Sequence, residues 1–202
     1  MLIENIALLE KLDYTKQLAF AYLTCERLYP NYIYFSKNFN FGDKATLREA
    51  INFIHRALLR SELSTDFLSE QEISTLLHNV DLNTPFPHNF ATITASSALD
   101  ACAVISETLE FLLDKNESRL NAISTCATDT VDMFVQERDD LDFNTDAGFE
   151  KKIFNDELMQ REIHIQKGII EYLSKIGRLE LLDVNNLIEL QHNNGRSNID
   201  LD

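Results

Sequence analysis

Glycine and proline are scarce in this chain, which has five glycines and three prolines among its 202 residues. An all-β or loop-rich fold would need more of both, because tight turns use the positive φ of glycine and the fixed φ of proline. The stretches between these residues are long enough for helices. The scarcity therefore predicts an all-α fold.

Cysteine and long apolar runs are also in short supply. The three cysteines, Cys25, Cys102 and Cys126, are odd in number and form no CxxC pair, which excludes a disulfide framework and indicates a reducing compartment. No stretch approaches the roughly 18 apolar residues of a membrane span, and no basic region followed by an apolar run opens the chain. We therefore expect a cytoplasmic protein.

Basic residues are few. Lysine and arginine number 18 against 33 aspartates and glutamates, which gives a formal net charge of −15. Phosphate backbones and anionic membranes repel such a chain unless it carries a local basic patch, and no dense Lys/Arg run is present. The composition therefore excludes nucleic acid and membrane as partners and is typical of a solvated acidic surface.

The residues that are abundant predict a globular helical bundle. Hydrophobic residues make up 45% and charged residues 25%, and the length suits one domain, which we place at 1–202. Helical apolar spacing and capping residues predict about eight or nine helices. They fall at 3–12, 13–28, 30–39, 43–58, 69–77, 95–112, 116–134, 154–176 and 179–192, with a proline-containing loop at 82–90.

The second half is the more regular. From about Phe90 onward, apolar residues alternate gaps of three and four, a seam typical of up-and-down bundles. We therefore expect an up-and-down core there, with the short N-terminal helices packed against one end. Ile163 and Ile170 lie opposite the main stripe of the helix at 154–176, so we expect that helix to be central, and cover by a partner protein is the alternative.

Four motifs carry a family resemblance. They are Cys25-Glu26-Arg27-Leu28-Tyr29-Pro30-Asn31-Tyr32, Phe41-Gly42-Asp43, Leu99-Asp100-Ala101-Cys102 and Ser197-Asn198-Ile199. With them the chain resembles the YjaG-like family of bacterial proteins over nearly its whole length. The resemblance implies an all-helical domain of unknown function in a bacterial cytoplasm. It also implies a link to histidine-kinase signalling through gene neighbourhood, but it supplies no reaction and no catalytic residue.

The first candidate site surrounds the first of these motifs. Five polar or aromatic residues, Glu26, Arg27, Tyr29, Asn31 and Asp43, gather at a predicted helix junction. We expect a buried polar network there, and a site for a ligand or partner is the alternative. Cys25 is expected in the core, because Arg27 points about 200° around the helix from it. Asp100 needs a partner if it faces inward, and Arg27 is the partner we expect.

A second candidate is His164 with Lys167 and Gly168. Histidine phosphotransfer domains carry a similar His-x-x-Lys-Gly on an exposed helix face. The imidazole acts as nucleophile, the lysine one turn on meets the phosphoryl charge, and the glycine lets a receiver domain approach. Here Ile169, Ile170 and Glu171 follow, where those domains use small residues, so an ordinary surface histidine is the alternative.

Two patterns resemble metal sites without completing them. The acidic connector 139–148 resembles the start of a calcium loop, but Thr145 stands where glycine is needed and Lys151 where a bidentate glutamate is needed. Glu189 and His192 form one Glu-x-x-His, whereas a di-iron bundle needs two such motifs and two further glutamates. We therefore predict no metal site and no cofactor.

These observations favour a non-enzymatic interaction or regulatory module. The chain lacks a complete catalytic constellation, its charge is acidic, and the resemblance points to signalling proteins as partners. We expect a homodimer. Two alternatives from other classes stay open, a histidine phosphotransfer-like protein that uses His164 and a metal-binding helical bundle.

Overall fold

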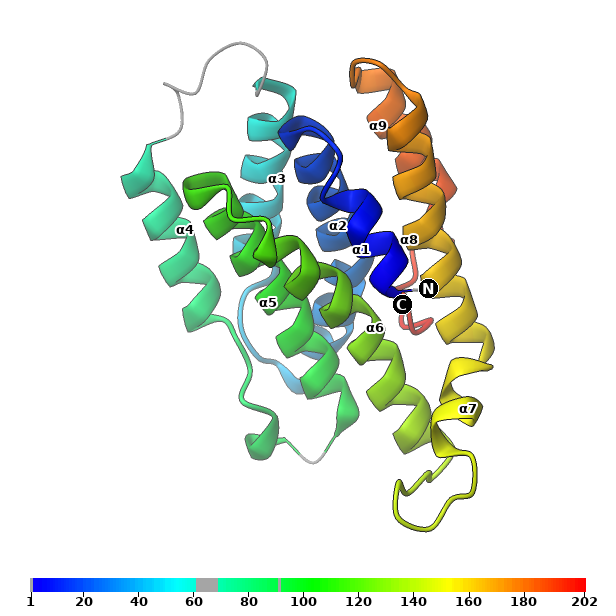
Figure 1. Ribbon diagram of the computed structural model, residues 1–202. Coiled ribbons are helices and arrows are strands. Elements are labelled where there is room, and N and C mark those ends of the chain that lie inside the picture. Colours follow the sequence, from blue (N-terminus) through cyan, green and yellow to red (C-terminus); the bar gives the residue numbers. More distant parts are fainter. Residues whose placement is uncertain (1, 61–68, 91) are drawn as a thin grey trace.

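The computed structural model describes residues 2–60, 69–90 and 92–202, and within these ranges the chain forms nine α-helices, one short 3-10 helix and no strand (Figure 1). The α-helices are α1 (Leu2–Leu9), α2 (Tyr14–Phe39), α3 (Lys44–Arg60), α4 (Glu70–Leu82), α5 (Ile93–Asp114), α6 (Ser118–Arg138), α7 (Phe149–Phe154), α8 (Glu157–Lys175) and α9 (Leu181–Leu190), and the 3-10 helix is η2 (Pro87–Asn89). The predicted all-α bundle of eight to nine helices is confirmed.

Capping side chains set several of the helix starts. Asp13 accepts a hydrogen bond from the backbone N–H of Lys16 at the start of α2, and Asp43 accepts one from Ala45 at the start of α3. A short polar side chain at this position satisfies a helix donor that would otherwise have no partner. Both caps agree with the starts predicted from the sequence.

Pro30 lies inside α2, so the predicted break before it is wrong. Proline removes one backbone donor and costs a helix interior about 3 kcal/mol. The residues that follow it outweigh that cost, because Asn31, Tyr32 and Phe35 are all fully buried. The two short helices expected at 13–28 and 30–39 are therefore one 26-residue helix.

The long helix expected at 154–176 is present as α8, which starts slightly later than predicted, and Phe154 ends the short helix α7 instead. α7 ends at Phe154, and Asp156 starts α8 by accepting a hydrogen bond from the backbone N–H of Leu158 at 2.9 Å. Ile163 and Ile170 on α8 are 2% and 1% exposed, so other elements of the same chain cover both sides of this helix.

α2 and α5 share the most extensive helix contact in the described chain, followed by α5 with α6. α8 packs on α6 and also touches α1, α9 and α2. The N-terminal region therefore supplies a central helix, α2, whereas the sequence suggested short helices packed at one end. No helix in the described ranges is both long and apolar enough to cross a membrane.

Candidate functional site

Arg27 forms a buried ion pair with Glu162, and this pair is the centre of the candidate site. Its Nε and Nη2 atoms donate to the two carboxylate oxygens at 3.0 and 2.9 Å, a bidentate geometry. The side chains are 3% and 0% exposed. Because water is excluded, the pair needs further hydrogen bonds to balance the desolvation of both charges.

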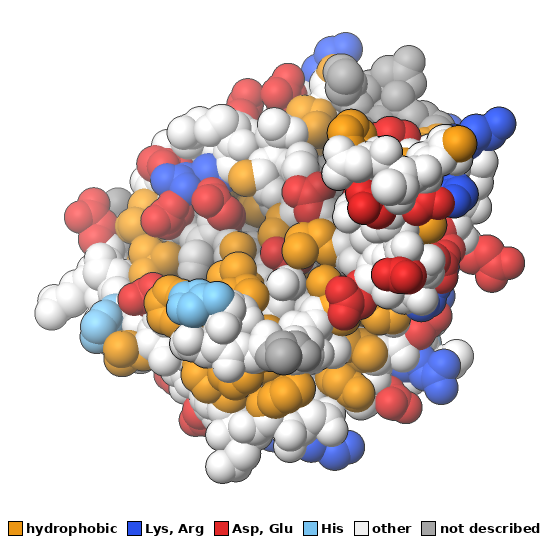
Figure 2. All heavy atoms as spheres, turned by 90° about the horizontal axis from the view of Figure 1, so that it is seen from below, with side chains coloured by type: hydrophobic (Ala, Val, Ile, Leu, Met, Phe, Trp, Pro, Cys, Tyr) orange, Lys and Arg blue, Asp and Glu red, His pale blue; other side chains and the backbone are white. Residues whose placement is uncertain are grey.

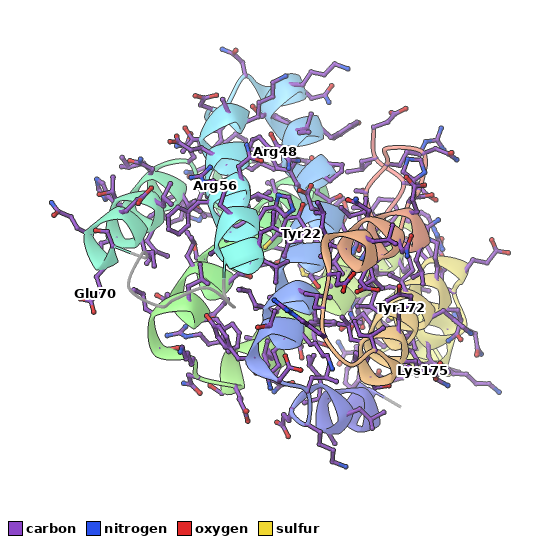
Figure 3. The ribbon with its side chains drawn as sticks, turned by 90° about the horizontal axis from the view of Figure 1, so that it is seen from above. Tyr22, Arg48, Arg56, Glu70, Tyr172 and Lys175 are labelled. Atoms are coloured by element: carbon purple, nitrogen blue, oxygen red, sulfur yellow. The ribbon has the colours of Figure 1, made fainter. Side chains whose placement is uncertain are left out.

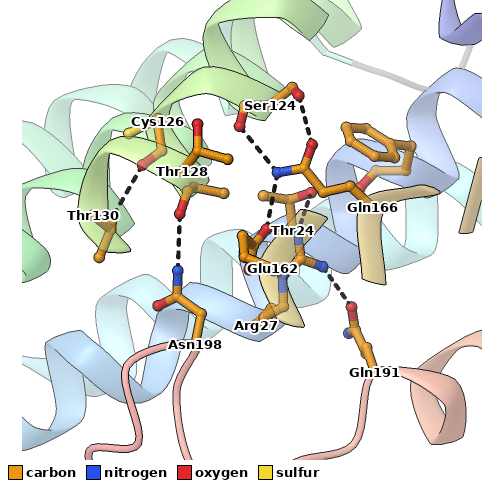
Figure 4. A network of polar contacts seen from close by, with 12 residues as sticks. Thr24, Arg27, Ser124, Cys126, Thr128, Thr130, Glu162, Gln166, Gln191 and Asn198 are labelled. Atoms are coloured by element: carbon orange, nitrogen blue, oxygen red, sulfur yellow. Dashed lines mark hydrogen bonds and ion pairs between the residues drawn. The ribbon is translucent and has the colours of Figure 1, made fainter. Parts of the chain in front are cut away.

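Amide and hydroxyl side chains from α6, from α8 itself and from the residue after α9 provide those bonds (Figure 4). Gln191, which follows α9, accepts from Arg27 Nη1 at 2.8 Å. Gln166 donates to Glu162 at 2.9 Å and accepts from the Ser124 hydroxyl of α6 at 2.6 Å. We call this set the polar junction, and it ties α2, α6 and α8 to the start of the C-terminal segment.

Asn31, one turn after Arg27, extends the polar junction into the C-terminal segment. Its Nδ2 donates to Asn198 Oδ1 at 3.0 Å, and Asn198 Nδ2 donates to the carbonyl of Ala127 on α6 at 3.0 Å. Arg161 of α8 donates to the Asn198 carbonyl at 2.9 Å. Asn31 Oδ1 is buried with no hydrogen-bond partner in the described chain. The Ser197-Asn198-Ile199 motif is therefore a segment docked between α2, α6 and α8.

The structure brings Arg27 and Asn31 into this network, but sequence reasoning missed their partners Glu162 and Gln166. A signal for them exists. Positions 162 and 166 continue at helical spacing the stripe of Ile169 and Leu173, so both had to face the interior. A charged or amide residue at such a position requires a buried partner.

Glu26 lies on the side of α2 that faces α3, where its partners Tyr22 and Arg48 are labelled in Figure 3. Arg48 of α3 donates to both of its carboxylate oxygens at 2.7 and 2.9 Å, and Tyr22 donates to one of them at 3.0 Å. The Arg48 guanidinium also lies 4.2 Å from the ring centre of Tyr29. The Glu26 and Arg48 side chains are 22% and 35% exposed, so solvent reaches this pair.

His55 of α3 belongs to the same outer surface. Its ring stacks on Tyr22 with the ring centres 4.9 Å apart, and its Nε2 is buried with no hydrogen-bond partner in the described chain. Burial lowers the pKa of this imidazole, because the charged form loses water. The ring acts here as a neutral packing group between α2 and α3.

Asp43 serves the turn between α2 and α3. Its backbone N–H donates to Asn83 Oδ1 at 2.6 Å while its side chain caps α3. Gly42 before it has φ +64°, and a Cβ there would lie 2.1 Å from the Tyr32 hydroxyl. The Phe41-Gly42-Asp43 motif therefore has a steric reason, because only glycine accepts this positive φ and leaves room for the Tyr32 hydroxyl.

Asp100 does not reach Arg27, so the expected pairing is wrong. It accepts a hydrogen bond from the Thr130 hydroxyl of α6 at 2.8 Å and makes no ion pair with any described residue. Burial raises the pKa of this carboxyl to about 6. Arg27 is occupied by Glu162, which lies 135 residues away in the sequence.

Cys25 is a core residue. Its Sγ lies 3.3 Å from the Thr108 hydroxyl, and burial raises the pKa of the thiol to about 12. A reactive cysteine needs the thiolate near neutral pH, so this thiol is inert.

His164 and Lys167 are exposed on α8, and Gly168 is half-buried. His164 Nδ1 lies 2.6 Å from the carbonyl of Gln160, which fixes the ring on the helix. Gly168 faces Leu190 of α9, whose side chain would lie 3.6 Å from a Cβ placed there. α9 therefore stands beside the surface that a receiver domain would approach.

The two incomplete metal patterns take different places. The acidic connector is closed on itself, with Asp146 accepting from the Asp142 backbone and pairing with Lys152. Glu189 and His192 both point into solvent near the end of α9. Across the described ranges, no three His, Cys, Asp or Glu side chains gather in a way that could hold a metal ion.

The geometry defines a class: an all-helical bundle whose central helix is tied to its C-terminal segment through a buried polar junction. A family model described as "Protein of unknown function (DUF416)" matches residues 5–202, and the chain belongs to this family. Similarity to two YjaG proteins confirms the predicted resemblance to the YjaG-like family.

Relatives support the same assignment. The chain is 29% identical over 124 residues to "Uncharacterized protein YjaG" of Salmonella typhimurium, covering 59% of this chain and 58% of that protein. It is 29% identical over 99 residues to the protein of the same name from Escherichia coli K12, covering 49% and 47%. The matches thus span about three fifths or less of these relatives. A crystal structure of a DUF416 family protein from Shewanella baltica OS155 superposes with a TM-score of 0.85 at 27% identity, covering 97% of both chains.

Proposed function

We propose that this protein is a non-enzymatic interaction module of the bacterial cytoplasm. One observation carries the proposal: the charged and amide side chains of the motifs, Arg27, Asn31 and Asn198, are enclosed in hydrogen bonds inside the bundle. Arg27 donates to Glu162 and Gln191, and Asn31 donates to Asn198. Side chains enclosed in this way stabilise a scaffold, and the scaffold leaves its surfaces for binding.

The proposal includes self-association as a homodimer. Leu181 and Leu182 at the start of α9 are 52% and 66% exposed, and Leu59 at the end of α3 is 42% exposed. Leu59 and Leu181 line one surface pocket of about 330 Å³. Apolar side chains around a surface hollow are typical of protein contacts. A histidine kinase or another signalling protein is the first heterologous partner to test.

Native mass spectrometry of the untagged protein from its host, purified without chelators, tests the proposal. We expect the mass of a homodimer or of a complex with a second protein. A stoichiometric metal ion, small molecule or phosphoryl group would instead point to chemistry and overturn the interaction-module proposal.

A second candidate function is phosphotransfer through His164, and the imidazole geometry favours it. A ring nitrogen 2.6 Å from a carbonyl oxygen must carry a hydrogen, so Nδ1 donates to Gln160, and in the neutral ring the lone pair is on Nε2. Nε2 could then attack a phosphoryl phosphorus, form an N–P bond and release the donor. The exposed ammonium of Lys167, which lies one turn on and 3.7 Å from Glu171, would meet the phosphoryl oxygens.

Labelled acetyl phosphate, or a histidine kinase with its receiver domain, tests this candidate. Transfer predicts acid-labile label in the wild type and none in His164→Gln, with His192→Gln as the control at another exposed histidine. Absence of label in the wild type under both conditions would exclude the phosphotransfer function.

A further inference from the structure

Four phenylalanines form a cluster at the end of the bundle where α2 stops. The buried ring of Phe35 has Phe39, Phe41 and Phe90 around it, with ring centres 4.9, 5.7 and 4.9 Å away. Phe39 and Phe41 also contact Phe90 edge to face at 5.8 and 5.5 Å. We call Phe39, Phe41 and Phe90, together with Phe86 on the same loop as Phe90, the aromatic platform.

Hydrogen bonds between two loops hold the aromatic platform in place. Asn83, just after α4, accepts from the Tyr32 hydroxyl at its carbonyl (2.9 Å) and from the Asp43 backbone at its side chain (2.6 Å). Gly42 lets these groups approach. The loop carrying Phe41 and the loop carrying Phe86 and Phe90 are therefore joined, so little conformational entropy is lost when a partner binds the rings.

The aromatic platform reaches the surface. Phe86 is 62% exposed and Phe39 is 42% exposed. Figure 2 looks onto this end of the molecule and shows hydrophobic side chains gathered across it, with more acidic than basic side chains around them. Asp81, five residues before Phe86, is exposed, and the acidic connector, with Phe143 70% exposed, projects from the same end of the bundle (Figure 1).

The geometry points to the aromatic platform as the docking surface for a basic, apolar segment of another protein. Exposed aromatic rings on a rigid backbone are the anchors that dominate binding energy, and their faces attract lysine and arginine. The net charge of −15 steers a basic segment toward the chain. A second copy at this surface would bring another chain of net charge −15 against this one, so a different, basic partner fits better. This inference rests on the proposed interaction function.

Fluorescence anisotropy with short labelled helical peptides tests the surface at physiological salt. The probes are a leucine/lysine peptide, a leucine/glutamate peptide and a serine/lysine peptide of the same charge as the first. We expect the first to bind most tightly and Phe86→Ser to weaken it about tenfold or more. Phe39→Ser is the second variant. Leu113→Ser is its matched control, because Leu113 is 41% exposed near the far end of α5.

Equal binding of the leucine/lysine and serine/lysine peptides, or equal losses for Phe39→Ser and Leu113→Ser, would overturn the assignment. A photoreactive residue in place of Phe86, used in the host, separates the two proposals. An adduct to a basic, apolar segment that Phe39→Ser suppresses supports the docking surface. An adduct to a second copy of the chain would overturn the docking surface but not the interaction function. The same holds if no adduct forms while native mass spectrometry finds a complex. If no complex or adduct forms, the interaction function itself fails.

Discussion

Glu26 and Arg27 are adjacent in one motif, yet they occupy opposite environments. Arg27 joins Glu162 inside the bundle, where the two side chains are 3% and 0% exposed. Glu26 joins Arg48 on the α3 side, where the exposed fractions are 22% and 35%. The two pairs have similar lengths, 2.9 and 2.7 Å, so distance does not distinguish them. Burial distinguishes them. Removing one partner of the Arg27–Glu162 pair leaves an unpaired charge in the interior, whereas removing one partner of the Glu26–Arg48 pair leaves a charge that water can solvate.

The largest effect is expected for Arg27→Met. It leaves the Glu162 carboxylate buried without its guanidinium, and breaking a buried pair in this way costs about 3–5 kcal/mol. Urea unfolding followed by circular dichroism measures the loss. The double variant Arg27→Met/Glu162→Leu should recover most of it, because no buried charge is then left. No recovery would mean that the pair itself, and not its desolvation, stabilises the bundle.

A smaller loss is expected for Asn198→Ala on the same inner side. The substitution leaves Asn31 Nδ2 and the Ala127 carbonyl without their partner, at a cost of about 1–3 kcal/mol in the free energy of unfolding. Asn185→Ala, at an exposed position of α9, is the control. It should leave the stability unchanged or slightly raised, because alanine favours helices. An equal loss of stability in both variants would show that the hydrogen bonds of Asn198 do not stabilise the fold.

Asp100 provides a buried carboxyl without a cation, and its effect depends on pH. Its pKa rises from 3.8 to about 6 on folding, so the unfolded chain loses this proton first. The contribution of Asp100 to the free energy of unfolding therefore falls as pH rises from about 4 to about 6. Asp100→Asn should remove this fall and make the protein more stable than wild type at pH 7. The measurement is the difference between the two unfolding curves across this range, and a constant difference contradicts the prediction.

The smallest effect is expected for Glu26→Gln. The Glu26–Arg48 pair is reached by solvent, and such pairs contribute about 0–1 kcal/mol. The loss should shrink further in high salt, which screens exposed charges. Thermal unfolding at low and high salt measures it. A loss as large as that of Arg27→Met would show that burial is not what separates the two sides of α2.

Local signals predicted much of the fold. The caps at Asp13 and Asp43 and the break at Gly42 each depend on a few neighbouring residues, and the structure has them where the sequence placed them. The continuation of α2 through Pro30 could not be predicted from neighbouring residues. Whether a proline breaks a helix depends on how much the following turns bury, and the burial of Tyr32 and Phe35 comes from distant elements.

The candidate site was predicted in part for the same reason. The motif around Arg27 indicated a polar network, but its charge partner had to be found among all the acidic residues of the chain. The small residues beside Asp100 favour it as the partner of Arg27. Glu162 lies in an amphipathic helix in which no neighbouring residue singles it out. Pairing of helix faces decides such a choice, and one sequence gives no measure of which faces meet.

The docked C-terminal segment has a consequence for how the protein is made. Arg27 leaves the ribosome early, but Glu162, Gln191 and Asn198 follow it or its neighbour Asn31 by 135, 164 and 167 positions. During synthesis the Arg27 guanidinium stays in contact with water until Glu162, the carboxylate that neutralises it inside the bundle, has been made. Contacts of such long sequence separation slow folding. Translation that stops before Gln191 would yield chains that cannot close the polar junction, which makes them natural targets for proteolysis.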